Sequence, residues 1–156
     1  SGPGCHIQLR GLQIYEIDVT LRLEAYTTLQ GMGRGSQVRY GRIESAGSAI
    51  NVIGNAGIEN NGGYSAAGNI VVRDLDIYST SSGIGFGHAE NILVENVHCS
   101  WYGQSDQIGH FVDICGCSNV IVQSCFVKAP MVGQGVFQVD SAGTGALIHR
   151  LSDIST

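Results

Sequence analysis

The chain has 156 residues, of which 43% are hydrophobic and 13% are charged, a composition that excludes a disordered protein. No apolar run approaches the roughly 20 residues that would cross a bilayer. The net charge of −5, from 8 basic and 13 acidic residues, argues against nucleic-acid binding. The 23 glycines and only two prolines indicate many tight turns. We expect a single domain over residues 1–156 that is a fragment of a longer protein.

An apolar pattern recurs in chain order, with hydrophobic residues at a first position and then two, five and seven residues later. The first copy consists of Ile7, Leu9, Leu12 and Ile14. All six copies, of which the second and the last are weaker, begin at Ile7, Val38, Ile70, Ile92, Val120 and Ala146. The steps between these starts are 31, 32, 22, 28 and 26 residues. Unequal steps argue against a solenoid of strict period and favour one with loops of different length.

The spacing within each copy predicts a bent strand. Residues one and three share one face, because side chains alternate along a strand. The step from three to six breaks this alternation, so a corner is expected there. Asn69, Asn91 and Asn119 stand just before three of the copies. Asparagine tolerates the left-handed backbone angles that such corners need.

A second short apolar strand follows five of the copies. Its members are Val19, Leu21 and Leu23, then Ile50 and Val52, Ile84 and Phe86, Val112 and Ile114, and Phe137 and Val139. The predicted fold is therefore all-β, a right-handed single-stranded parallel β-helix of about six coils. A β-sandwich, which is also built from short strands and glycine turns, is the alternative.

The segments NIVVRDLDI (69–77) and NILVENVHC (91–99) resemble coils of the pectate-lyase-like β-helix superfamily. The stretch TLQGMGRGSQVRY (28–40) is similar to the early coils of that group, which includes phage tailspikes and tail appendage proteins. The resemblance implies a polysaccharide ligand and a place outside the cell or on a virion surface. The polygalacturonase motifs are absent, and Gly87-His88-Ala89 is only a partial echo of one of them.

Carboxylates on the second strands are the candidate catalytic groups. Asp113 and Asp140 are expected on one outer face beside Gln138, with glycines that leave room for a ligand. Together with Asp106 they could divide the acid and base or nucleophile roles of glycoside hydrolysis. The resemblance also allows Ca²⁺ at a set formed by Asp74, Asp76 and Glu44 near Arg42 and Arg73. The alternative for both groups is that the charges are simply solvated.

The segment 100–110 between two copies contains the only tryptophan. Trp101, Tyr102 and His110 are predicted to contact sugar there, because aromatic rings pack on apolar faces of sugars while polar groups bind the hydroxyls. The alternative is that Trp101 folds back as a lid over the edge of the coil.

One outward column is unexpectedly apolar. Val71, Leu93, Ile121 and Leu147 each follow the start of a copy by one residue and should face outward. A continuous apolar stripe often marks a partner surface, so a homotrimer through these residues is predicted. The alternative is that loops of the same chain cover them.

The five cysteines fit no disulfide framework and no zinc spacing, so they are interpreted mostly as free thiols, and no metal site or other cofactor is predicted. The leading hypothesis is a module that binds, and in one version also depolymerises, a surface polysaccharide. A structural or adhesion module without catalysis and a pectate-lyase-like enzyme are the alternatives. Whether the chain is an enzyme stays open at this point.

Overall fold

A computed structural model describes residues 4–33, 35–40, 51–57, 64–79, 82–101, 111–128, 137–140 and 147–152. Within these ranges the regular structure is entirely β-strand. The strands are β1 (Cys5–Gln8), β2 (Gln13–Ile17), β3 (Leu21–Leu23), β4 (Thr27–Gln30), β5 (Ser36–Tyr40), β6 (Asn51–Asn55), β7 (Ile70–Ser79), β8 (Ser82–Gly87), β9 (Glu90–Trp101), β10 (Val112–Cys115), β11 (Ser118–Gln123), β12 (Phe126–Lys128), β13 (Phe137–Asp140) and β14 (Leu147–Ser152). In this described part no helix is long and apolar enough to cross a membrane.

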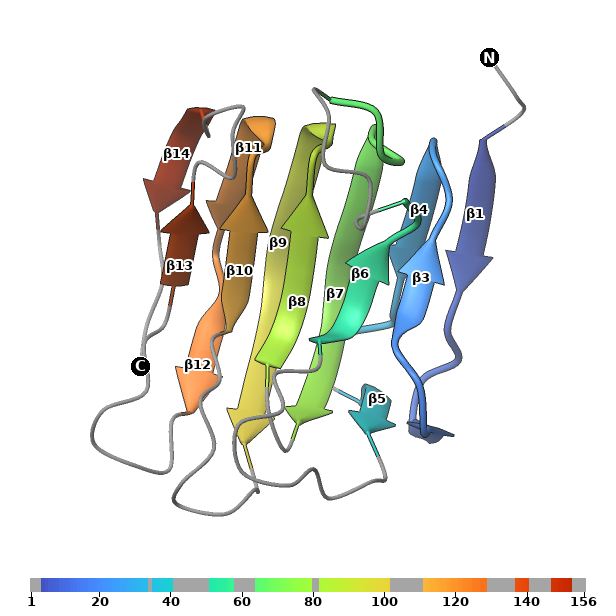
Figure 1. Cartoon of the computed structure of the whole chain (residues 1–156). Helices are drawn as coiled ribbons and strands as arrows, with labels where there is room; N and C mark the ends of the chain where they lie inside the picture. Colours follow the sequence, from blue (N-terminus) through green and yellow to red (C-terminus); the bar gives the residue numbers. More distant parts are fainter. Residues whose placement is uncertain are drawn as a thin grey trace.

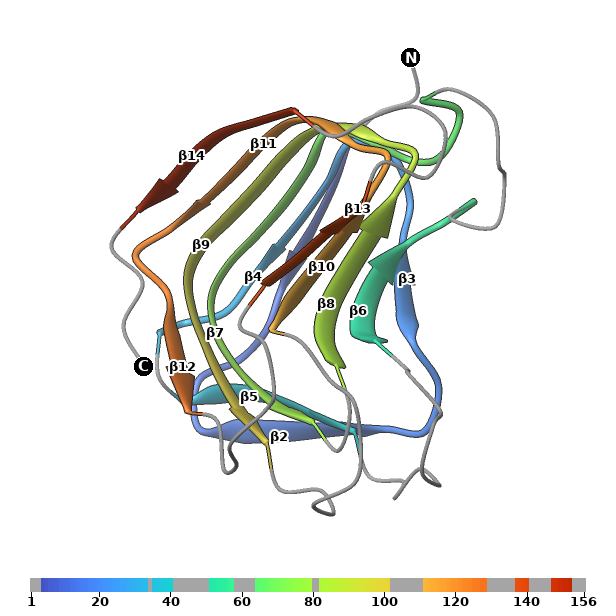
Figure 2. The ribbon, with the colours of Figure 1, turned by 60° about the vertical axis from the view of Figure 1, so that its left-hand side comes forward.

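The strands form two sheets of parallel strands, and in Figure 1 the second sheet lies in front of the first. Among the described residues the first sheet has nine strands, and six of them follow the order β1-β4-β7-β9-β11-β14. Of the other three, β12 pairs with β9, β5 pairs with β7, and β2 pairs with β5. The second sheet has five strands, ordered β13-β10-β8-β6-β3. From β7 to β11 the chain alternates between the sheets, which face each other in Figure 2. The predicted all-β organisation is thus confirmed at the level of parallel strands in sheets.

The core lies between the sheets and follows the repeated pattern. In the three copies that begin at Ile70, Ile92 and Val120 the patterned positions with described side chains are all buried: Ile70, Val72, Leu75 and Ile77; Ile92, Val94, Val97 and Cys99; Val120, Val122 and Cys125. The second sheet adds Leu23, Ile53, Ile84, Phe86, Val112 and Ile114. Ile53 rather than the predicted Val52 pairs with Ile84, although both Val52 and Ile53 are buried.

Both predicted corners are present. Asn69, Asn91 and Asn119 have φ of 55°, 60° and 56°. The residues between the third and sixth positions of the same copies, Asp74, Asn96 and Ser124, have φ of 57°, 49° and 53°. The left-handed residue turns the chain and shifts the alternation by one, so that apolar residues on both sides of the corner face the core.

The first copy was predicted correctly at Ile7 and Leu9, but its second half and the register of the second copy were wrong. Leu12 and Ile14 are 90% and 61% exposed, while Tyr15 and Ile17 pack against the core instead. The pairing joins Ile7 to Leu29 and Tyr15 to Val38. The reason is extra length at the corner between β4 and β5, where residues 31–36 connect Gln30 to Gln37 while only Asp74 and Leu75 connect their partners Arg73 and Asp76. The strand β4, with Leu29 fully buried, was missed.

The strand register predicted for the last copy was also wrong. Leu147 pairs with Ser118, whereas Ile148 pairs with Val120 and Arg150 with Ile121. Two register shifts in this strand pair change the alignment. Leu147 is therefore not part of the apolar stripe, and its predicted place beside Ile121 is taken by Arg150.

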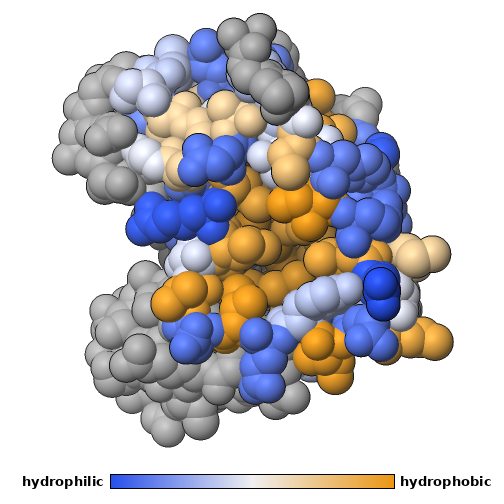
Figure 3. All heavy atoms as spheres, turned by 90° about the vertical axis from the view of Figure 1, so that its right-hand side faces the viewer, coloured by the Kyte–Doolittle hydropathy of each residue, from blue (hydrophilic) through white to orange (hydrophobic). Residues whose placement is uncertain are grey.

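The end of the molecule at β1 is apolar in its middle. Figure 3 shows this end, with hydrophobic residues gathered in a hollow that polar residues surround. Ile7, Tyr15, Ile17 and Leu21, from β1, β2 and β3, are the partly buried residues that pack against the core at this end. The core is thus less completely covered here than in the middle of the sheets.

Candidate functional site

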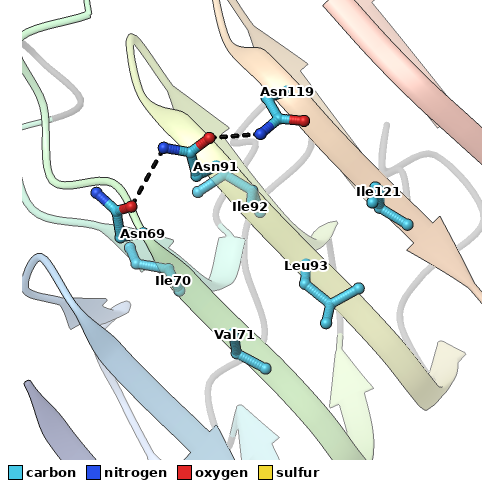
Figure 4. Close-up of a pocket in the computed structure, with 8 residues that line it drawn as sticks. All are labelled: Asn69, Ile70, Val71, Asn91, Ile92, Leu93, Asn119 and Ile121. Carbon is cyan, nitrogen blue, oxygen red and sulfur yellow. Dashed lines mark hydrogen bonds between the residues drawn. The ribbon is translucent and has the colours of Figure 1, made fainter.

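The outer face of the first sheet carries an open hollow of about 320 Å³ across three neighbouring strands. Figure 4 shows its lining, which comes from β7, β9 and β11 and the residues just before them: Asn69, Ile70, Val71, Asn91, Ile92, Leu93, Asn119 and Ile121. The lining combines aliphatic side chains with carboxamides. We call this hollow the amide–aliphatic groove.

The aliphatic part is a continuous row. Val71 pairs with Leu93, and Leu93 pairs with Ile121, so the three side chains lie one strand apart. All three are partly buried. They occupy the outward positions that the sequence predicted, next to the inward residues Val72 and Val94. The row offers a ligand an apolar strip perpendicular to the strands.

The carboxamides form a ladder beside this row. The Nδ2 group of Asn91 donates to Oδ1 of Asn69 at 3.2 Å, and Nδ2 of Asn119 donates to Oδ1 of Asn91. A carboxamide has two N–H groups and an oxygen with two lone pairs. The ladder uses one N–H and one lone pair of Asn91, which leaves hydrogen-bonding capacity for a ligand. Sequence reasoning missed the ladder, although its signal was an asparagine at the same position of three copies.

A second open hollow, of about 570 Å³, lies on the same sheet nearer to β1. It is lined by Gln8, Gln30, Gly31, Met32, Gly33 and Asp74. We call it the glutamine–aspartate hollow. Sequence reasoning missed Gln8 and Gln30, because their place beside Arg73 and Asp74 depends on the pairing of the overlooked strand β4 with β7.

Asp74 is the centre of a hydrogen-bonded cluster at this hollow. Gln30 Nε2 donates to Asp74 Oδ2 at 3.2 Å, and Asn96 Nδ2 donates to Asp74 Oδ1 at 2.8 Å. Arg73 Nη2 donates to Gln30 Oε1 at 2.9 Å, and its Nε lies 3.9 Å from Asp74 Oδ2. Both carboxylate oxygens therefore accept amide hydrogen bonds, and the positions of Gln30 and Arg73 are coupled.

The glycine-rich segment forms the rim of this hollow. Gly31 N donates to Arg73 O, Gly33 N donates to Asp74 O, and Met32 N donates to Ser36 Oγ, with distances of 3.0, 2.9 and 2.8 Å. A Cβ on Gly31 would lie 2.2 Å from Asp74 O, so only glycine fits there. The segment is a turn whose backbone is hydrogen-bonded to β7.

The predicted acidic face lies on the other sheet. Asp113 is partly buried and pairs with Gly85 on one side and Gln138 on the other, while Asp140 pairs with Cys115. The backbone register thus places Asp113 and Asp140 on adjacent strands, two residues apart along the strand.

The room that glycine was expected to leave beside Asp113 is filled. A Cβ on Gly85 would lie 1.9 Å from Nδ2 of Asn51, so the Asn51 side chain occupies that space. At Gly54, a Cβ would meet Cγ2 of Thr20 at 3.3 Å. The expectation of ligand space over these glycines is therefore wrong, because side chains of the same chain pack there.

The remaining predicted site residues are described only in part. Trp101 ends β9 opposite Ser79, and Gln138 and Asp140 belong to β13, but the side chains of these three residues lie outside the described part. Asp106, Tyr102 and His110 lie outside the described residues altogether. The predicted contacts of this aromatic segment stay predictions.

The described residues contain no group of three or more His, Cys, Asp or Glu side chains placed to hold a metal ion. The five cysteines are free, and Cys99, Cys117 and Cys125 are buried. Burial raises the pKa of Cys117 and of Cys125 to about 11 and that of Cys99 further. These thiols are protonated at neutral pH and are therefore poor nucleophiles.

Comparison with known proteins gives one informative likeness. No family model and no curated protein matches the chain. A crystal structure described as that of a putative glycosyl hydrolase from Parabacteroides merdae superposes with a TM-score of 0.54. The match covers 97% of this chain and 80% of that one, at 16% sequence identity. At this identity the likeness supports the fold and leaves the activity to other observations.

Proposed function

We propose that the chain is a right-handed parallel β-helix module that binds a polysaccharide along the outer face of its first sheet. The alternation of the chain between two parallel sheets supports the β-helix, as do the repeated corners at equivalent positions. In this arrangement equivalent residues of successive coils stand side by side. A repeating ligand would therefore meet a repeating surface.

The single observation that carries the proposal is the amide–aliphatic groove. Sugar rings present apolar C–H faces bordered by hydroxyls, so a sugar site needs apolar surface next to precise hydrogen-bonding groups. Val71, Leu93 and Ile121 supply the first, and the ladder of Asn69 and Asn91 supplies the second. The structural neighbour described as a putative glycosyl hydrolase agrees with a ligand of this class.

Cleavage would take place elsewhere on the molecule. Asp113, Asp140 and Asp106 are the proposed carboxylates for that version of the function, with Trp101, Tyr102, His110 and Gln138 as proposed sugar contacts. A location outside the cell or on a virion surface belongs to the same proposal. Because the amide–aliphatic groove is open while Asn51 fills the space over Gly85 beside Asp113, binding without cleavage is the function that we favour.

The proposal is tested by incubating the protein with bacterial capsule, lipopolysaccharide, neutral plant glycans and pectin. Bound glycan, new reducing ends and the ultraviolet absorbance of unsaturated products are followed. Replacement Leu93→Glu puts a charge into the apolar row and should reduce binding at least tenfold, which corresponds to about 1.4 kcal/mol. Asp113→Asn, on the other sheet, is the matched control and should bind like the parent.

Each result has a defined meaning. Binding that is lost in Leu93→Glu and kept in Asp113→Asn supports the proposed face, provided that the circular dichroism of both variants matches the parent. Release of reducing ends that stops in Asp113→Asn would show a hydrolase instead of a binding module. Failure to bind any glycan of the panel would overturn the proposal.

A further inference from the structure

The glutamine–aspartate hollow is a second place on the same face where polar groups converge. Its lining differs from the amide–aliphatic groove in having one charged residue, Asp74, and one exposed apolar side chain, Met32, which is 69% exposed. The two hollows lie on the same sheet, since Asp74 and Val71 both belong to β7. A chain-like ligand in the groove could extend toward the hollow.

The Asp74 carboxylate has acceptor capacity that its neighbours among the described residues do not fill. An ionised carboxylate offers about four lone-pair positions. Gln30 and Asn96 use one on each oxygen. One lone-pair position therefore remains on each oxygen of Asp74. Two hydroxyl groups on neighbouring carbons of a sugar have about the right separation to donate to both. Charge-assisted hydrogen bonds of this kind are roughly twice as strong as neutral ones.

The charges and donors around Asp74 argue against an acidic sugar and against calcium. Asp74 is the charged residue of the described lining and disfavours a uronate or a phosphate there, while the guanidinium of Arg73 beside it is already engaged by Gln30 and lies 3.9 Å from the Asp74 carboxylate. The amide N–H groups that point at both of its oxygens would also face a bound cation, and calcium requires six to eight oxygen ligands. The set of Asp74 and Asp76 is therefore poorly suited to the Ca²⁺ that the family resemblance allowed.

The rim of the hollow is fixed before any ligand arrives. Gly31 and Gly33 are hydrogen-bonded to β7, and the Ser36 hydroxyl accepts from Met32 N and donates to Arg10 O at 2.9 Å. Gln8 Nε2 donates to the carbonyls of Gln30 and Gly31 at 3.2 and 3.1 Å. Preorganisation of this kind reduces the entropy that binding costs.

From these contacts we infer that the glutamine–aspartate hollow is a calcium-independent subsite for an uncharged sugar residue. Asp74 accepts hydrogen bonds from two adjacent hydroxyls, and Met32 covers the apolar face of the ring. This inference rests on the proposed function, because it assigns one sugar of a bound polysaccharide to a defined place.

The test is a binding titration of the purified full chain with two sets of glycans, in EDTA and in calcium. Dextran, galactomannan and cellohexaose are the uncharged probes, and polygalacturonate and alginate are the acidic ones. Asp74→Asn replaces one carboxylate oxygen with an NH2 donor and removes the charge, and it should weaken binding of the uncharged probes at least tenfold. Asparagine tolerates the φ of 57° at this position, so the fold should persist.

Ser124→Asn is the matched control, because Ser124 has the same corner conformation two strands away and does not line the hollow. It should bind like the parent. If the Asp74→Asn variant does not fold, Asp74→Ser repeats the test, because serine is the residue that forms the equivalent corner at Ser124. Unchanged binding in a folded Asp74 variant, a requirement for calcium, or preference for the acidic probes would overturn the subsite.

The two proposals fail in different ways. Loss of binding in Leu93→Glu together with unchanged binding in Asp74→Asn would leave the proposed function standing and remove the subsite. Absence of binding to every probe would remove both.

Discussion

The corner residues show how single side chains direct the path of this chain. Asn69, Asn91 and Asn119 combine a left-handed backbone with a ladder of side-chain hydrogen bonds. Asparagine is suited to both roles, so these corners could be predicted. Leu12 and Tyr26 also have positive φ, of 57° and 61°. Leucine and tyrosine rarely adopt this conformation, so it could not be predicted from these residue types.

Asn91 is the middle member of the ladder, and its two contributions can be separated. Asn91→Ala should lower the free energy of unfolding by about 2 kcal/mol, because it adds left-handed strain and removes two hydrogen bonds. Asn91→Gly removes the hydrogen bonds without the strain and should cost about 1 kcal/mol. Urea unfolding measures both. Equal losses in the two variants would show that the backbone conformation contributes little.

Gly31 and Gly33 provide a second comparison at this scale. Gly31→Ala should cost about 3 kcal/mol, because its Cβ would lie 2.2 Å from Asp74 O and 2.9 Å from Leu75 Cβ. Gly33 has φ of 80° but open space around its Cβ position, so Gly33→Ala should cost only about 1 kcal/mol of strain. The same unfolding measurement checks the order, and a Gly33 variant that is the less stable would refute the packing at Gly31.

The buried thiols make stability depend on pH above the ordinary thiol pKa. Between about pH 9 and about pH 11 the unfolded chain loses the protons of Cys117 and Cys125 while the folded chain keeps them. Unfolding then releases protons, so the free energy of unfolding should fall as pH rises, by about 1.4 kcal/mol per pH unit for each thiol. Below about pH 9 these thiols should contribute no pH dependence.

The measurement for this prediction is urea unfolding at about pH 8 and about pH 10. Cys125→Ala removes one of the thiols and should make the decrease smaller, whatever it does to stability at about pH 8. A decrease of the same size in parent and variant would show that Cys125 does not contribute to it.

At the scale of elements, the sequence predicted β7, β9 and β11 well because their copies contain the full pattern with a one-residue corner. It predicted the inward residues Ile7 and Leu9 in and just after β1 but missed β4 and misplaced β2, since the corner there contains an insertion and the chance alternation of Leu12 and Ile14 imitated the pattern. The apolar row of the groove followed from alternation alone. The glutamine–aspartate hollow could not be predicted, because it depends on the pairing of strands that lie far apart in the sequence.

At the scale of the whole molecule, the predicted homotrimer stays a prediction. Its contact surface would be Val71, Leu93 and Ile121, without Leu147. Sedimentation equilibrium should give three times the mass of the chain if this row packs between copies, and Leu93→Glu should then give a single chain. A parent that sediments as a single chain would remove the trimer and leave the row free for a ligand.

The most direct test of the account is whether a polysaccharide contacts the outer face of the first sheet. Methyl spectra of isotope-labelled protein, recorded while the best-binding glycan is added, report this residue by residue. We predict shifts at Val71, Leu93 and Ile121, with much smaller shifts at the inward-facing Val72 and Val94 of the same strands. Shifts confined to methyl groups of the second sheet, such as those of Ile84 and Ile114, would contradict the account.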